Sequence, residues 1–416
     1  MQSIAATGFT KGFDMSLYIA AQEGNVARLR DALASEKIAI RQRATELLGE
    51  HADPEDTATV DALLQQAMND EDGNVREAGV AALDALGPEA LDRLVAEHAF
   101  DRDPGDRELS VKACARVLKS ERAELRLAAV HALERLGDSS GVPLVVRALG
   151  DDDARVRRRA CSAAGALESE QLVQPLTERL EDGRGVRRAA IIALGRIGTK
   201  PACQQLVSLL SADDPIVRRD VTRALGIARY TPAINGLLSR VDDPNSEVSG
   251  AAFRAVMEVL PDLPSDTIEN IRKELLSRLE QQPSRAANDL LLTLTREGRR
   301  SGIRVQAIWL LGNLSTRDDN TIIEAMIGAL ETGEDVVKDA ARQQLVEMSP
   351  TRVRYQLFDL LQRNPPGRTR AAIAWILGHH GGDGVHDRLE QLSDDEDPDV
   401  RKQAHTALER LGGDTE

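Results

Sequence analysis

The chain is poor in aromatic residues and in cysteine. Phe, Trp and Tyr make up 2% of its 416 residues, whereas apolar residues make up 42%. The hydrophobic core must therefore consist mainly of Ala, Leu, Val and Ile, which suits closely packed helices. Cys114, Cys161 and Cys203 lack metal-binding or disulfide spacing. We expect them to be small buried side chains in a reducing cytosol.

Long apolar runs are absent as well. No stretch approaches the ~18 consecutive apolar residues that indicate a membrane helix, and no signal-peptide pattern is present. We therefore predict a cytoplasmic protein that has no membrane partner. Residues 1–14 are expected to form a disordered tail, and the native start is either Met1 or Met15.

Positive charge is scarce and is carried almost entirely by arginine. The formal net charge is −15, and only eight of the 53 basic residues are lysine. A surface poor in Lys and rich in Asp remains hydrated in concentrated salt, which predicts a halophilic archaeon or a GC-rich bacterium as the source. The acidic balance argues against a nucleic-acid partner, because nucleic acid requires a cationic face.

A repeat organises most of the sequence. Eleven segments align on one position, usually an apolar residue followed by Arg, and a spacing of 31 residues recurs between them. The aligned residues, at what we call position zero, are Ile40, Val75, Leu125, Val156, Val186, Val217, Val248, Ile303, Val337, Thr369 and Val400. Position four is small or apolar and position eight is usually Leu, so these positions form one face of an α-helix.

Another helix is expected before each of these Arg-bearing helices. Examples are Pro201–Leu210 and Thr321–Leu330, and an acidic turn such as Asp213–Pro215 joins the two helices of a unit. Aspartate suits both the turn and the start of the next helix. Glycine at position twelve, as at Gly137, predicts a helix end in the left-handed conformation.

The full pattern is nearly intact at Asp213–Gly226 (DDPIVRRDVTRALG), and it resembles the short HEAT repeats of the phycobilisome-lyase type. The resemblance covers nearly the whole chain after residue 15. It implies an all-α fold, an α-α superhelix (HEAT-repeat solenoid) of about a dozen helix pairs. It also implies that the Arg after position zero bonds the acidic turn of an adjacent unit. The residues to which this structural role carries over are Arg41, Arg76, Arg126, Arg157, Arg187, Arg218, Arg304, Arg370 and Arg401.

The repeat rhythm breaks in two places. A degenerate unit between Val75 and Leu125 carries the acidic loop Asp101–Asp106. A second break holds an irregular helical insert, which we interpret as a bend, with a flexing hinge as the alternative. The predicted segments are a tail at 1–14, an N-terminal array at 15–260, the insert at 261–300, a C-terminal array at 301–412 and a tail at 413–416.

Positions two, six and nine of the Arg-bearing helices are predicted to face away from the core. The arginines at these positions in successive units are Arg158, Arg188 and Arg219 at position two, and Arg223 and Arg254 at position six. Residues 154–229 carry 14 basic and eight acidic side chains, although starting the count at Asp151 reduces the excess from six to three. One interpretation is a basic stripe that receives an acidic or phosphorylated protein partner. The other is a solvated face in which these arginines pair with nearby carboxylates.

Position six also carries both tryptophans of the chain, Trp309 and Trp375. Because this position holds mostly polar residues in the other units, the two side chains are candidate interface anchors. The alternative is that each indole ring folds down onto the adjacent repeat.

Residues that carry out chemistry are sparse. The Gly-rich loop that contains His379, His380, Asp383 and His386 is either a metal site or an ordinary turn, and we predict no metal and no cofactor. Enzymes with HEAT-like repeats of the deoxyhypusine hydroxylase type hold iron with His-Glu pairs, and this sequence has no His-Glu dipeptide. DNA glycosylases with such repeats need a cationic groove and aromatic residues. A phosphate loop, a nucleophile elbow and a Ser/His/Asp set are also missing, so we predict that the chain is not an enzyme.

The predicted function is a non-catalytic adaptor that binds other proteins along its concave face. In composition the chain also resembles haloarchaeal HEAT-repeat proteins, some of which are linked to taxis signalling and the archaellum motor. That resemblance implies a role in archaeal taxis or motility. The alternative is a bilin-lyase-like or other HEAT-type enzyme or enzyme subunit, although a salt-adapted, non-photosynthetic source would offer no bilin substrate.

Overall fold

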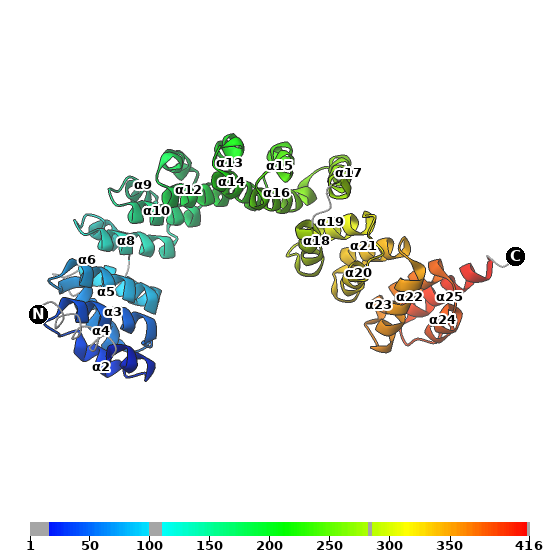
Figure 1. Ribbon diagram of the computed structural model, residues 1–416, viewed down its shortest axis with the longest axis horizontal. Coiled ribbons are helices and arrows are strands. Elements are labelled where there is room, and N and C mark those ends of the chain that lie inside the picture. Colours follow the sequence, from blue (N-terminus) through cyan, green and yellow to red (C-terminus); the bar gives the residue numbers. More distant parts are fainter. Residues whose placement is uncertain (1–15, 100–109, 282–284, 414–416) are drawn as a thin grey trace, which may run out of the picture. The chain divides into compact units, whose positions relative to one another are not determined.

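The computed structural model describes residues 16–99, 110–281 and 285–413, and all regular secondary structure in these ranges is helical (Figure 1). This confirms the predicted all-α class. The expected tail at 1–14, the start at Met15 and the acidic loop Asp101–Asp106 lie outside the described residues. No helix in the described part of the chain is both long and apolar enough to cross a lipid bilayer.

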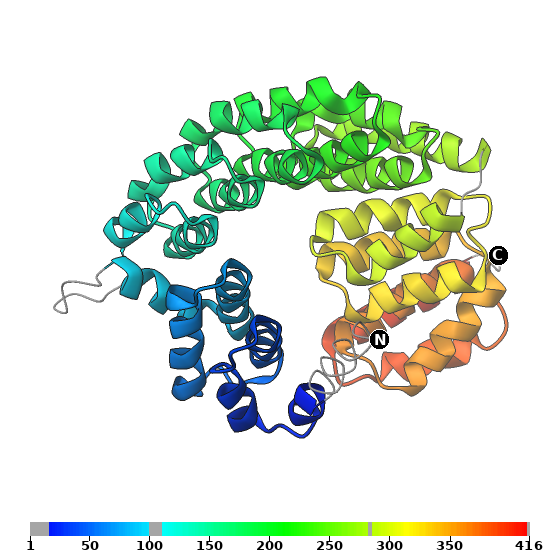
Figure 2. The same ribbon diagram turned by 60° about the vertical axis from the view of Figure 1, so that its left-hand side comes forward.

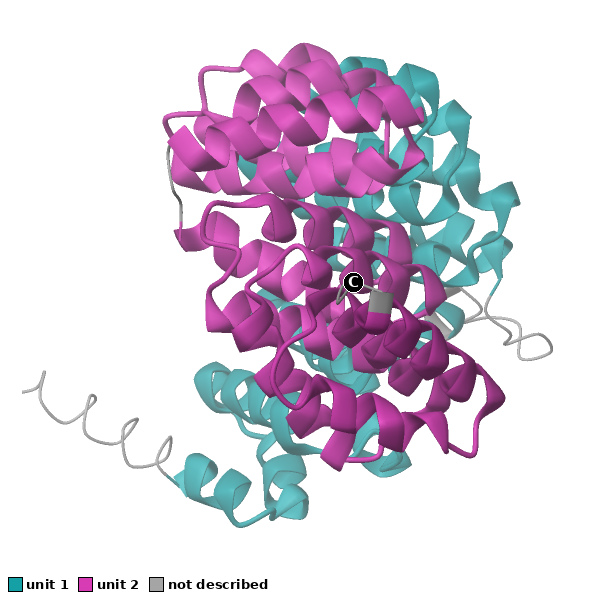
Figure 3. Cartoon of the chain, turned by 90° about the vertical axis from the view of Figure 1, so that its right-hand side faces the viewer, with its two compact units in different colours: residues 1–206 teal, residues 207–416 magenta. Residues whose placement is uncertain are grey.

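The chain forms two compact units, residues 1–206 and 207–416 (Figure 3). Their boundary lies within helix α13 (Lys200–Ser208), which is followed by the short 3₁₀ turn η4 (Leu209–Ser211). Within each unit the helices follow one another as packed pairs (Figures 1 and 2). The division into arrays on either side of an insert at 261–300 stays a prediction.

In unit 1, a first helix packs against the second helix of its own pair, and second helices of successive pairs stack. The first helices are α2 (Val26–Ala32), α4 (Thr57–Asn69), α7 (Val111–Val117), α9 (Val142–Leu149) and α11 (Val173–Glu178). The second helices are α3 (Ile38–His51), α5 (Gly73–Leu86), α8 (Ala123–Leu136), α10 (Ala154–Leu167) and α12 (Arg184–Ile197). The additional helix α6 (Pro88–Ala99) packs against α5, α7 and α8, and residues 16–22 are also helical. The 3₁₀ turns are η1 (Ser139–Gly141), η2 (Glu170–Leu172) and η3 (Arg179–Glu181).

Unit 2 repeats this arrangement. Its first helices are α15 (Ile234–Val241), α18 (Arg285–Glu297), α20 (Asn320–Thr332), α22 (Pro350–Gln362) and α24 (Val385–Ser393). Its second helices are α14 (Pro215–Ala228), α16 (Ser246–Val259), α19 (Ser301–Asn313), α21 (Asp335–Val346), α23 (Gly367–His380) and α25 (Pro398–Gly413). The 3₁₀ turns are η5 (Thr231–Ala233) and η6 (Leu260–Asp262). The predicted irregular insert contains one additional helix, α17 (Ser265–Gln281), which packs against α19, and the regular first helix α18.

Position zero lies in the core, as its periodicity predicts. Ten of the eleven aligned residues are buried, and Ile40 is half-buried. Leu408, at position eight of the last aligned helix, is also half-buried. Both residues belong to pairs near an end of the repeat array, where a neighbouring pair covers the helix on one side only.

Glycines in the second helices serve two different purposes. At position nine they allow close helix packing, because a Cβ atom on Gly378 would lie 2.5 Å from the Cβ of Ala407 in the next second helix. The prediction that position nine faces away from the core is therefore wrong, because this position contacts the neighbouring helix. At position twelve they end helices, because Gly137 caps α8 in the left-handed conformation with φ of 59°. The second purpose confirms the sequence prediction for Gly137.

The acidic turns cap the second helices. Asp153 accepts a hydrogen bond from the Arg155 amide at the start of α10, at 2.7 Å. Asp214 accepts one from the Ile216 amide at the start of α14, at 2.9 Å. These side chains satisfy amide groups that have no partner inside the helix, and their charge opposes the positive end of the helix dipole.

Candidate functional site

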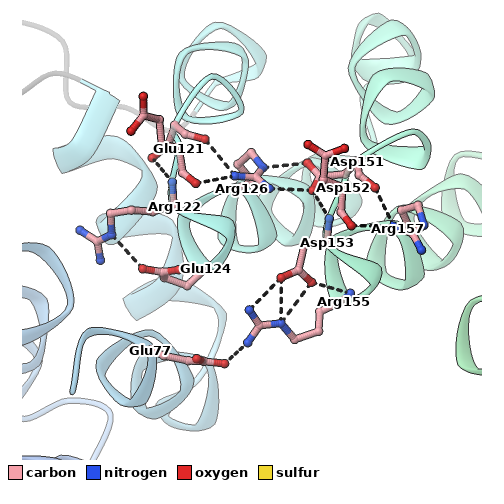
Figure 4. Close-up of polar contacts among 11 residues, drawn as sticks. Glu77, Glu121, Arg122, Glu124, Arg126, Asp151, Asp152, Asp153, Arg155 and Arg157 are labelled. Atoms are coloured by element: carbon pink, nitrogen blue, oxygen red, sulfur yellow. Dashed lines mark hydrogen bonds and ion pairs between the residues drawn. The ribbon is translucent and has the colours of Figure 1, made fainter. Parts of the chain in front are cut away.

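A ladder of arginine–aspartate pairs joins successive repeats. Arg126 donates two hydrogen bonds of 2.7 Å to Asp151 of the next acidic turn (Figure 4). Its Nη1 atom donates to the carbonyl oxygens of Ser120 and Glu121 in its own turn, at 3.1 and 2.9 Å. The five pairs of this kind among the described residues are Arg41–Asp70, Arg126–Asp151, Arg157–Asp182, Arg218–Asp243 and Arg370–Asp395. These five arginines therefore have the structural role that the repeat resemblance implies.

The other four arginines of the series do not form this pair among the described residues. Among the residues that the structure describes, Arg76 and Arg401 donate only to carbonyl oxygens of their own turns. Arg304 donates to the Thr295 carbonyl at 2.9 Å. An aspartate follows 25 residues after each of Arg126, Arg157, Arg218 and Arg370. The residue 25 positions after Arg187 is Ala212, so Arg187 lacks the carboxylate that the pair requires.

The ladder changes the ionisation of its carboxyl groups. The hydrogen bond from Arg157 lowers the pKa of Asp182, against an opposing effect of burial. The pKa of Asp70 is lowered in the same way by Arg41. Both carboxylates therefore stay charged at neutral pH, as the ladder requires.

A pocket of about 510 Å³ lies on the second helices of unit 1. Its lining residues come from α5, α6, α8, α10 and α12. They are Glu77, Val80, Ala81, Asp84, Leu91, Glu124, Leu127, Ala128, His131, Arg155, Arg158, Arg159, Ser162, Gly185, Arg188, Ala189 and Ile192. We call this pocket the unit 1 groove. It contains Arg158 and Arg188, two of the candidate residues identified from the sequence.

The basic side of the unit 1 groove comes from α10 and α12. Arg155 is held by Asp153, at 2.9 Å, and by Glu77 (Figure 4). Arg159 lies 3.3 Å from Glu134. Arg158 is exposed and has neither an ion pair nor a hydrogen bond from its side chain to the described residues.

The acidic side of the unit 1 groove comes from α5 and α8. His131 of α8 lies 2.9 Å from Asp84 of α5, and the hydrogen bond from the imidazole lowers the pKa of Asp84. Glu77 and Glu124 line the same side. Sequence reasoning missed this side, although Glu77 occupies position two and His131 position six of earlier units. Comparison of positions two and six in these earlier units would have identified the acidic side.

The remaining arginines of the predicted stripe belong to unit 2. Arg219 pairs with Asp220 at 3.0 Å and with Glu247 at 2.5 Å, so it is paired within the chain as in the second interpretation, but it is half-buried and does not belong to a solvated face. Arg223 and Arg254 are exposed, and their side chains have no ion pair or hydrogen bond among the residues that the structure describes.

Both tryptophans are half-buried, each beneath an arginine from an earlier helix of unit 2. The Arg272 guanidinium lies 5.0 Å from the centre of the Trp309 ring, and that of Arg342 lies 4.5 Å from the centre of the Trp375 ring. The Trp375 ring also contacts His379, with 3.9 Å between ring centres. Each indole therefore has one face covered by its own chain, and its remaining exposed part is smaller than expected from the polar residues at position six.

The histidines of the Gly-rich loop do not converge on one point. A ring nitrogen of His379 lies 2.7 Å from the Trp375 carbonyl oxygen, and one of His380 lies 3.1 Å from the Val346 carbonyl oxygen. His386 lies instead near Glu390, at 3.6 Å, in an exposed group that also includes Asp387. Exposed acidic groups of this kind are common in proteins without a bound ion.

The three cysteines are buried, as expected. Burial raises the pKa of Cys114 and of Cys161 to about 12, and that of Cys203 to about 11. Thiols with such values are protonated at neutral pH and make poor nucleophiles.

Paired helices, position-nine glycines and an Arg–Asp ladder define an α-helical repeat protein. The family model for HEAT repeats matches residues 26–115, 111–185, 184–257 and 355–416, which is more than half of the chain. The chain belongs to the HEAT-repeat family. It is 31% identical over 411 residues to a HEAT repeat-containing taxis protein of Halobacterium salinarum, and this match covers 96% of the chain and 100% of the relative.

Two solved structures are also similar to the chain. One is an engineered protein, with 20% identity, coverage of 93% of this chain and 98% of that protein, and a TM-score of 0.42. The other is from the complex of CpcE and CpcF of phycocyanin lyase from Nostoc, with 23% identity, coverage of 60% and 91%, and a TM-score of 0.35.

Proposed function

We propose that this HEAT-repeat chain is a non-catalytic adaptor in archaeal taxis signalling, and that its unit 1 groove binds an acidic segment of a partner protein. The main support is the taxis-named relative, whose whole length is matched at 31% identity. A match over the full length includes every repeat, so it favours a shared binding role over a shared local motif.

The chemistry of the unit 1 groove supports an acidic partner segment. Arg158 and Arg188 are exposed residues on two successive second helices, Arg188 with an interaction inside the chain, and guanidinium groups bind carboxylates in a forked geometry. Leu91 and Val80 are buried in the same lining, whereas Leu127 is half-buried. A partner segment with acidic residues beside an apolar side chain would therefore pair with the basic side of the groove and contact Leu127.

The alternative of a lyase-type enzyme has less support from the residues of the groove. Its lining has no cysteine, and its histidine is paired with Asp84 at 2.9 Å. The lining has one serine, Ser162, and no hydrogen bond joins it to His131 among the described residues, so the groove lacks a serine activated by this imidazole.

A deletion experiment tests the proposed role in taxis. In the organism that encodes the chain, deletion should leave cells able to swim but unable to change their reversal frequency after a light or chemical stimulus. Cell tracking before and after the stimulus measures this response, and expression of the wild-type chain from a plasmid should restore it. A deletion strain that responds normally would refute a role in taxis.

A further inference from the structure

A second groove lies on the first helices of unit 2, on different helices from the arginine stripe and the tryptophans. Its volume is about 730 Å³, and its walls are α20 and α22, which pack against each other. The lining residues are Asn320, Glu324, Ile327, Gly328, Glu331, Thr351, Arg352, Tyr355, Gln356, Asp359, Leu360 and Arg363. We call this pocket the Tyr355 groove.

Tyr355 is unusually exposed for an aromatic residue. Its exposed fraction is 79%, the highest among the large hydrophobic side chains of the described residues. A chain with only three tyrosines therefore places one of them almost entirely in solvent, at the edge of a groove. Exposed tyrosines in grooves are frequent binding hot spots, because the ring supplies a large contact area at a low cost in conformational entropy.

Two of the three acidic groups of the Tyr355 groove are available to a ligand, whereas its basic groups are engaged. Arg352 donates to the Asp318 carbonyl oxygen, and Arg363 pairs with Asp359 on its own helix. Glu324 and Glu331 of α20 have no ion pair or side-chain hydrogen bond within the described ranges. The groove therefore offers two unpaired carboxylates to a positively charged ligand.

The spacing of these carboxylates suits a helical ligand. Glu324 and Glu331 are seven residues apart on α20, which corresponds to two turns and about 10.5 Å along the helix axis. A helix lying along α20 that carries basic side chains seven residues apart would place one opposite each carboxylate. Ile327 and Leu360, which are 8% and 2% exposed, form the apolar floor between the walls.

We infer that the Tyr355 groove binds an amphipathic helix of a partner protein, with two basic side chains seven residues apart paired with Glu324 and Glu331. The Tyr355 ring packs against the apolar face of this helix, at the side opposite α20. This inference goes beyond the proposed function, because the site uses none of the residues of the unit 1 groove and selects the opposite charge. An adaptor with both sites is able to hold one acidic and one basic partner.

A peptide experiment tests the inference directly. The probe is a fluorescently labelled synthetic amphipathic helix with two arginines seven residues apart, and its twin carries glutamate at both positions. Fluorescence anisotropy with the full chain should give saturable binding of the arginine peptide, and about tenfold or more weaker binding of its twin. Equal affinities for the two peptides, or no saturable binding of the arginine peptide, would overturn the inference.

Variants of exposed positions separate binding from folding. Tyr355→Ala should weaken binding of the arginine peptide about tenfold or more, whereas Ile227→Ala, at another exposed position of unit 2, should leave it unchanged. Gly328→Leu should also block binding, because a Cβ atom there has no neighbour within 4 Å and the new side chain would enter the groove. The double variant Glu324→Lys/Glu331→Lys should reverse the preference in favour of the glutamate peptide. Unchanged binding by Tyr355→Ala would contradict the inference.

A second copy of the chain is another possible occupant of this surface. Sedimentation of the wild type and of Tyr355→Ala distinguishes the two cases. The inference predicts the same oligomeric state for both proteins. A wild-type dimer that becomes a monomer in Tyr355→Ala would assign the groove to self-association and would overturn the inference, while leaving the taxis proposal intact.

Discussion

Arg126 and Asp151 are joined by two parallel hydrogen bonds, Nε to Oδ2 and Nη2 to Oδ1, each 2.7 Å long. The same guanidinium group binds two carbonyl oxygens of its own turn. One side chain thus connects consecutive turns of the repeat. Apolar packing of position zero gives the helix pairs their stability, and this polar link fixes the register between neighbouring pairs.

The ladder predicts a specific pattern of stability changes. Asp151→Ala should lower the free energy of unfolding by about 1.5–3 kcal/mol, because Arg126 loses a charged, largely buried hydrogen-bond acceptor. Asp61→Ala is the control, since its exposed carboxylate forms a surface pair with Arg93 at 2.6 Å and should matter little. Chemical denaturation followed by circular dichroism measures both. Equal losses in the two variants would show that the ladder has no special contribution.

The ladder also predicts loss of stability in acid. The pKa values of Asp70, Asp182 and Asp395 are lowered, in each case first by the hydrogen bond from the paired arginine. A carboxyl group whose pKa is depressed by folding stabilises the native state above its unfolded pKa of about 3.9, and this contribution is lost as the pH falls through the lower folded value. The melting temperature should therefore fall steeply below about pH 4.

Thermal melts from neutral to acidic pH, at constant salt, check this prediction. The melting temperature of Asp151→Ala should depend less on pH than that of the wild type. Burial raises the pKa of Asp151, but its hydrogen bonds, including that from Arg126, outweigh this effect and lower the pKa, and the variant lacks this carboxyl group. A wild-type melting temperature that stays constant between about pH 5 and pH 3 would contradict the role of the ladder.

Replacing glycine by alanine should have opposite effects on stability at two positions of unit 2. Gly378→Ala should destabilise the chain by about 1–3 kcal/mol, because its Cβ atom would overlap Ala407 of the next second helix. Gly328→Ala should stabilise it by about 0.5–1 kcal/mol, because the new methyl group meets no atom within 4 Å and alanine favours the helix. Denaturation curves of the two variants decide the matter. Stabilisation by both substitutions would mean that position nine tolerates a side chain.

The repeat and its helix faces could be predicted from the sequence because they depend on residues within a single helix pair. Val156, Val217 and Val400 are buried at equivalent places, as their alignment predicts. Arg158 is exposed because it lies two residues, or about 200°, from the buried position. The family assignment followed from the same pattern.

Contacts between successive repeats could not be predicted in this way. The pairing of Arg219 with Glu247 depends on how the next helix is placed, 28 residues later in the chain. The cover of Arg342 over Trp375 likewise depends on the preceding second helix. The repeat register is defined by the second helices, so the sequence pattern does not single out Tyr355, which lies in a first helix.

The capture of partners by the unit 1 groove is the most direct test of the proposed adaptor function. Tagged wild type, Arg158→Glu/Arg188→Glu and the control Lys273→Glu/Arg285→Glu, which makes the same charge change at exposed positions of unit 2, would be expressed in the native organism. Mass spectrometry would quantify the proteins that copurify with each. The adaptor function predicts that the first variant keeps its helical circular dichroism but loses acidic taxis proteins that the wild type and the control retain. Retention of the same partners by all three proteins would contradict it.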